Sequence, residues 1–105
     1  MTERRASKRI TANVETKFFI SNMFYAGNVK DFSKEGMLIK TNIIVPFGSL
    51  FVVTLSVKDK LLKLLVRVRR IVEKNSIFPG VGVEVINPPQ QYADFVEDLS
   101  TYLYP

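Results

Sequence analysis

The sequence Asn28-Val-Lys-Asp-Phe-Ser-Lys-Glu-Gly-Met-Leu-Ile39 is the most informative part of this chain of 105 residues. Asp31 and Ser33 stand two residues apart between apolar runs, and Gly36 follows three residues later. Asp and Ser favour turns because their side chains bond the nearby backbone, and glycine tolerates unusual φ values. We therefore predict a ligand-facing turn between two strands, with Gly36 in an unusual backbone conformation.

A basic cluster, Arg4-Arg5-Ala-Ser-Lys-Arg9, lies upstream of this stretch. The whole chain has 15 basic and 10 acidic residues, a net charge of +5. This excess favours anionic partners such as a nucleotide, a nucleic acid or an acidic membrane surface. Residues 1–9 show no apolar periodicity, so we expect a flexible basic arm followed by a single domain over residues 10–105.

The composition argues against most catalytic functions. The chain contains neither cysteine nor histidine, which removes thiolate nucleophiles, the commonest metal ligand and the commonest general base. We therefore expect no enzyme, no cofactor and no bound metal. No apolar run approaches the roughly 18 residues of a membrane span, so we expect no membrane span and a cytoplasmic location.

Alternating apolar and polar residues predict several strands. The pattern is clear over residues 10–20, 50–57 and 80–86, and shorter apolar runs flank the Asp31 turn. Residues 61–72 fit either a basic amphipathic helix or a strand. Their many β-branched side chains and partial alternation favour the strand.

One amphipathic helix is predicted at the end of the chain. Asn87 suits a helix N-cap and Pro88 suits the first helical position. The apolar residues that follow recur at three- and four-residue intervals; they are Tyr92, Phe95, Val96, Leu99, Tyr102 and Leu103. The chain is thus expected to be mainly β, a six-stranded antiparallel β-barrel with a C-terminal α-helix packed on it or closing one end. We expect the aromatic core to include Phe18, Phe24, Phe47, Phe51 and Phe95.

Arg5-x-x-x-Arg9 followed by Asp31-x-Ser33-x-x-Gly36 resembles the two motifs of the PilZ domain family, small β-barrels that bind cyclic di-GMP. The resemblance covers nearly the whole chain: residues 26–31 are similar to the family's approach to its turn, and residues 80–84 to its last strand. It implies a receptor for this second messenger that acts on a protein partner to regulate motility, polysaccharide or biofilm. Its expected ligand-binding residues are Arg4, Arg5, Arg9, Asp31, Ser33 and Gly36.

The resemblance also implies a role for each residue. Arg5 and Arg9 would contact phosphate and guanine, Asp31 and Ser33 would contact guanine, and Gly36 would keep the backbone clear. The chemistry is suitable, because an arginine fork matches N7 and O6 of guanine while a carboxylate accepts from N1 and N2. Arg4 would add a contact if a stacked pair of ligands binds.

Two other functions fit the same residues. A basic arm on a β scaffold suits nucleic-acid binding, but single-strand binders present exposed aromatics, and here the aromatics fall mostly on apolar positions. Nucleic acid is therefore the less favoured ligand. The third reading is a protein-interaction module with the PilZ fold and no ligand. A monomer and a homodimer are both compatible with the sequence.

Overall fold

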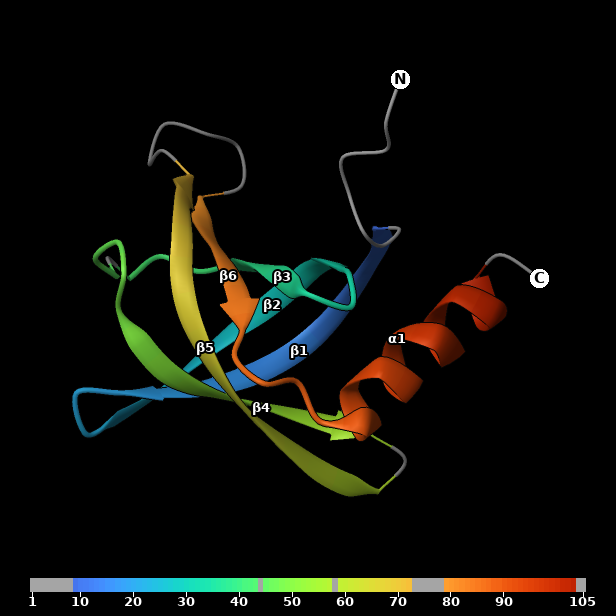
Figure 1. Ribbon diagram of the computed structural model, residues 1–105. Helices are drawn as coiled ribbons and strands as arrows, with labels where there is room; N and C mark the ends of the chain where they lie inside the picture. Colours follow the sequence, from blue (N-terminus) through green and yellow to red (C-terminus); the bar gives the residue numbers. More distant parts are fainter. Residues whose placement is uncertain (1–8, 44, 58, 73–78, 104–105) are drawn as a thin grey trace.

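The computed structural model describes residues 9–43, 45–57, 59–72 and 79–103 (Figure 1). Of the basic arm predicted for residues 1–9, only Arg9 lies within these ranges; Arg4 and Arg5 lie outside the described residues. No helix in the described ranges is long and apolar enough to cross a membrane.

Six strands form a closed barrel in the order β1-β2-β3-β6-β5-β4, and every neighbouring pair is antiparallel. A single helix, α1, follows them and lies beside the barrel (Figure 1). The predicted fold class is therefore confirmed. The elements are β1 (Ile10–Ile20), β2 (Met23–Phe32), β3 (Gly36–Lys40), β4 (Leu50–Val57), β5 (Lys60–Val72), β6 (Gly80–Val85) and α1 (Gln90–Leu103).

The ambiguous segment, residues 61–72, is a strand. It forms most of β5, which pairs with β4 from Lys60 to Arg67 and with β6 from Val66 to Val72. Leu64, Val66 and Val68 are buried in the barrel core. Two partner strands use the backbone hydrogen-bonding groups of β5 on both sides, and β-branched side chains suit the pleated surface, so the β propensity prevails over the helical spacing.

The helix begins later than the sequence predicts. Asn87 has a left-handed φ of 46° instead of capping a helix, and α1 starts at Gln90. The carbonyl of Pro89 accepts the first bond of the helix, from the amide of Tyr92 at 2.9 Å. Tyr92 and Val96 are buried in the same core cluster as the barrel side chains, so the helix packs against the barrel.

The prediction for the aromatic residues is only partly confirmed. Phe18 and Phe51 are buried with ring centroids 5.5 Å apart, and Phe95 packs edge-on against Phe32 of β2. Phe24 and Phe47 are instead 73% and 65% exposed. Phe24 contacts the partly exposed Phe19 across the β1–β2 hairpin, with the rings tilted by 50°, outside the core.

Gly36 is required for a different reason from the one predicted. Among the described residues, the only glycine with a left-handed φ is Gly48, so the expectation of unusual backbone conformation at Gly36 is wrong. A Cβ at Gly36 would lie 2.2 Å from the carbonyl oxygen of Val83 on β6. Glycine is needed at this position because the backbone of β6 lies too close to Gly36 for any side chain.

Replacing Gly36 with alanine should therefore destabilise the barrel. The new methyl group must push β3 away from β6, and overpacking of this kind costs about 1–3 kcal/mol of unfolding free energy. Denaturant unfolding would measure the loss. Gly82→Ala is the matched control on β6: the added Cβ would meet only the Arg70 side chain, which can move. Equal stability of the two variants would contradict this explanation.

Candidate functional site

The turn between β2 and β3 is closed by its own backbone and by Ser33. The amide of Ser33 donates to the carbonyl of Gly36 at 2.9 Å, and the Gly36 amide donates back to the Ser33 carbonyl at 3.3 Å. The Oγ of Ser33 accepts from the amides of Glu35 and Gly36 at 3.3 and 3.2 Å. Ser33 is 2% exposed, so its hydroxyl shapes the turn from inside it.

Strand pairing places Arg9 beside this turn. Ile10 and Thr11 of β1 pair with Phe32 and Asp31 of β2, so the residue before β1 lies at the start of the turn. The Arg9 guanidinium forms an ion pair with Asp31 and lies 3.5 Å from the Ser33 Oγ. The structure thus brings together three of the predicted site residues from the two motifs.

The pairing is irregular on both sides of Asp31. The β1–β2 register shifts between Thr11 and Val14, and the β2–β3 register shifts between Val29 and Asp31. Such irregularities change the direction of a side chain and occur next to functional sites. The Asp31 carboxylate remains 25% exposed and the Arg9 side chain 34% exposed, so both can reach a ligand.

Tyr92 of α1 belongs to the site but was not predicted there. Its hydroxyl lies 2.8 Å from the carbonyl of Ser33 and 3.0 Å from that of Gly36, and it donates to the turn. The residue is fully buried. Burial raises the pKa of the Tyr92 phenol, the Arg9 charge lowers it and the Asp31 charge raises it. From the sequence, Tyr92 was predicted only to belong to the apolar stripe of the helix.

The arrangement can bind a polar, planar or anionic group. Arginine has five N–H donors, and an ionised carboxylate accepts several bonds, so the Arg9–Asp31 pair retains unused donors and acceptors. Lys34 in the same turn lies 3.7 Å from Glu97 of α1 in an exposed ion pair. Within the described ranges, no group of three or more acidic, histidine or cysteine side chains could hold a metal ion.

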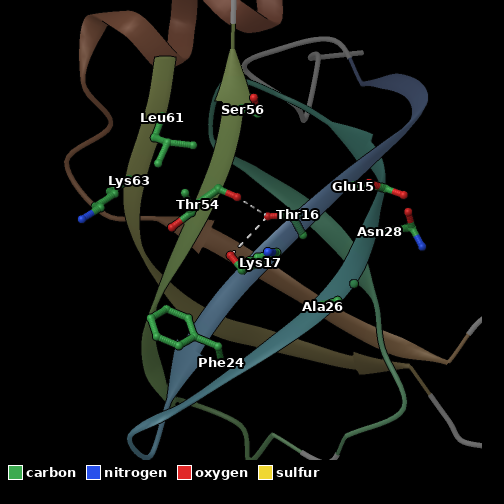
Figure 2. Close-up of a pocket in the computed structure, with 11 residues that line it drawn as sticks. Glu15, Thr16, Lys17, Phe24, Ala26, Asn28, Thr54, Ser56, Leu61 and Lys63 are labelled. Carbon is green, nitrogen blue, oxygen red and sulfur yellow. Dashed lines mark hydrogen bonds between the residues drawn. The ribbon is translucent and has the colours of Figure 1, made fainter. Parts of the chain in front are cut away.

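Another concave feature lies elsewhere on the barrel. A hollow of about 750 Å³ lies over β1, β2, β4 and β5, and it is lined by residues such as Lys17, Thr54 and Lys63 (Figure 2). None of its lining residues belongs to the Arg9, Asp31 and Ser33 cluster. The cluster is therefore an open surface site at the barrel rim, separate from this hollow.

Comparison with known proteins gives a family and a fold. The model of the PilZ domain matches residues 3–104. The PilZ domain with c-di-GMP of YcgR from Escherichia coli is 16% identical, with a TM-score of 0.79, and the match covers 96% of this chain and 95% of that one. No curated protein sequence gives a significant match.

Two longer proteins contain a similar fold. The Bacillus subtilis inhibitor of motility, MotI/DgrA, is 12% identical with a TM-score of 0.76, covering 92% of this chain and 49% of that one. The MrkH–c-di-GMP complex of K. pneumonia is 15% identical with a TM-score of 0.70, covering 97% and 54%. This chain spans about half the length of these two proteins.

Removing the Tyr92 hydroxyl should destabilise the protein without removing the aromatic ring. Tyr92→Phe removes this donor from two buried carbonyls that keep their bonds within the turn, which costs about 0.5–1.5 kcal/mol of unfolding free energy. Chemical denaturation would measure the change. Tyr25→Phe is the control, because Tyr25 is half-buried and its hydroxyl makes no hydrogen bond within the described ranges. A loss no larger than that of the control would contradict the anchoring role.

We expect the buried Tyr92 hydroxyl to make the wild-type protein less stable at alkaline pH. Tyrosine ordinarily has a pKa of 10.0, and burial raises the pKa of Tyr92 in the folded state. Its contribution is complete below pH 10 and is lost as the pH rises further, because the unfolded phenol ionises first. Between about pH 10 and 11, the wild-type unfolding free energy should fall up to about 1.4 kcal/mol per pH unit more steeply than that of Tyr92→Phe. Parallel pH profiles would contradict the prediction.

Proposed function

The chain belongs to the PilZ domain family, and on this premise we propose that it is a receptor for cyclic di-GMP and not an enzyme. One observation carries the proposal. Arg9, the second arginine of the first motif, contacts both Asp31 and Ser33 of the second motif. The two motifs are separated by about 20 residues of sequence, so this convergence comes from the fold.

Arg9 and Asp31 would form the part of the site that is already in place. The guanidinium can bind the phosphates or the N7–O6 edge of a guanine, and the carboxylate can accept from the opposite edge. Their ion pair restricts both side chains, which would reduce the ordering cost of binding. Ser33 would act mainly by shaping the turn, because its hydroxyl is buried there.

Arg5 and Arg4 would complete the site from the N-terminal arm. Arg5 is expected to contact phosphate and guanine with Arg9, and Arg4 to contact a second ligand molecule if a stacked pair binds. Contacts of Arg4 and Arg5 with the ligand would bring this arm over the barrel rim and change the surface that a protein partner meets. Regulation of motility, polysaccharide or biofilm from the cytoplasm, by a monomer or a homodimer, is the role that we propose.

The nucleic-acid alternative gains some support from the exposed Phe24 beside Lys17 in the hollow, because aromatics next to cations suit single strands. Against it, Glu15 also lines this hollow. A PilZ fold without ligand would require the Arg9–Asp31 pair to serve only stability, yet exposed ion pairs contribute little, with a median of about 0–1 kcal/mol. We therefore favour the receptor.

Calorimetry with cyclic di-GMP tests the proposal. Arg9→Ala and Asp31→Ala should each weaken binding roughly 5- to 150-fold, since one good bidentate contact is worth about 1–3 kcal/mol. Lys34→Ala, a nearby basic residue paired with Glu97, is the control and should bind nearly as the wild type. GTP and a single-stranded oligonucleotide should bind more weakly than the cyclic dinucleotide. Unchanged affinity in Arg9→Ala and Asp31→Ala, or preference for the oligonucleotide, would overturn the proposal.

The same titration tests Arg4. If a stacked pair binds, the wild type should take two ligands per chain and Arg4→Ala fewer. A stoichiometry of one in both proteins would exclude the pair and leave the receptor function intact.

A further inference from the structure

The outer face of β2, β1, β4 and β5 carries a continuous apolar row. Phe24 pairs with Phe19, Phe19 with Val52, and Val52 with Leu65, so one side chain from each strand stands in line across the barrel. Phe24 is 73% exposed and Leu65 is 45% exposed. Contiguous exposed apolar surface of this kind marks interaction sites.

The next row along the strands carries two lysines separated by small side chains, so the surface is depressed there. Lys17 pairs with Ala26 on one side and with Thr54 on the other, and Thr54 pairs with Lys63. Small side chains at Ala26 and Thr54 leave the hollow of about 750 Å³, and Figure 2 shows Phe24 toward one end of it and Leu61 toward the other. Leu61 is 69% exposed, so the hollow has apolar ends and a polar centre.

The two lysines have no carboxylate partner. Within the described ranges, neither Lys17 nor Lys63 forms an ion pair. Because they stand two strand spacings apart in one row, their Cα atoms are roughly 10 Å apart across Thr54. A carboxylate placed above Thr54 would lie between two ammonium groups and next to a hydroxyl. An acidic group at the centre of the hollow would therefore be complementary in charge to the two lysines.

We propose that this hollow, lined by Lys17, Thr54, Leu61, Lys63 and Phe24, binds an acidic amphipathic helix of a partner protein. Strand addition is not available, because the six described strands close the barrel and leave no free edge. A helix is about 10–12 Å across and rises 5.4 Å per turn, so the hollow can take roughly one turn. That turn would place an acidic side chain between the lysines and apolar side chains against Phe24 and Leu61.

A nucleic acid fits this face less well than an acidic helix. Leu61 and Leu65 offer exposed aliphatic surface instead of planes for stacking. The surface shares no residue with the Arg9 and Asp31 cluster. Binding of the helix is therefore proposed independently of the nucleotide and can be tested without it.

A yeast-displayed library of helical peptides of roughly 18 residues, about five turns, provides the probe. Its members carry leucine at i, i+4 and i+7 with all other positions varied among Glu, Lys, Gln and Ala, and they are sorted for binding to the full chain. Enriched peptides should be rich in Glu beside the leucines. They should bind Lys17→Glu/Lys63→Glu at least about tenfold more weakly, which is about 1.4 kcal/mol.

Two further variants separate charge, contact and folding. Lys34→Glu/Arg70→Glu changes the net charge by the same amount at exposed positions outside the hollow, and it should bind the peptides as the wild type does. Leu61→Asp should lose binding, and the variants of the hollow should keep the wild-type melting temperature because Lys17, Leu61 and Lys63 are exposed. These results would support the proposal.

Several outcomes would overturn the proposal. The first is a sort that enriches no acidic peptides. The second is a set of enriched peptides whose binding to Lys34→Glu/Arg70→Glu falls as much as their binding to Lys17→Glu/Lys63→Glu. Sedimentation that shows a dimer abolished by Leu61→Asp would assign the face to a second copy of this chain. Binding of an oligothymidylate that is lost in Lys17→Glu/Lys63→Glu would assign it to nucleic acid.

Discussion

The antiparallel pairing of β1 with β2 sets the geometry of the proposed nucleotide site. The partnership of Ile10 with Phe32 and of Thr11 with Asp31 sets where the chain enters the barrel. A slip of one residue would turn the side chains of β1 to the opposite face, which the buried Ile10 and Phe18 prevent. The hydrophobic core therefore fixes the register, and the register brings Arg9 to Asp31.

The helix adds a second constraint on the same turn. Tyr92 is buried beneath the turn and donates to its carbonyls, while Ser33 holds the turn from within. The Arg9–Asp31 pair on the surface thus lies beside a turn that is hydrogen-bonded to Tyr92 of α1. A helix that moved away would remove the phenol donor from two carbonyls of the turn, so the position of α1 and the shape of the turn are energetically linked. This link connects the proposed ligand site physically to α1.

Much of the fold could be predicted from the sequence because the barrel strands alternate in hydrophobicity. The turn at Asp31 and its meeting with Arg9 also followed from residue types and from the family resemblance. The start of α1 could not be predicted, because Asn87 and Pro88 look like a helix start, whereas Asn87 adopts a left-handed φ. Gly36 was explained wrongly because its need for glycine comes from Val83 on another strand. The role of Tyr92 could not be predicted, because a hydroxyl inside an apolar stripe gives no sign of its distant partner. The exposure of Phe24 could not be predicted either, because the alternation along a strand does not show which face of the sheet lacks a covering layer.

The central claim is that the basic residue before β1 and the turn after β2 bind one cyclic dinucleotide together. The most direct test is an NMR titration of the full chain with cyclic di-GMP, which follows the Arg9 side-chain Nε–H and the backbone amides of residues 31–36. We expect these signals to shift together and saturate together, while the amides around Thr54 in the hollow stay unchanged. Shifts confined to the hollow, or none at the turn at saturating ligand, would contradict it.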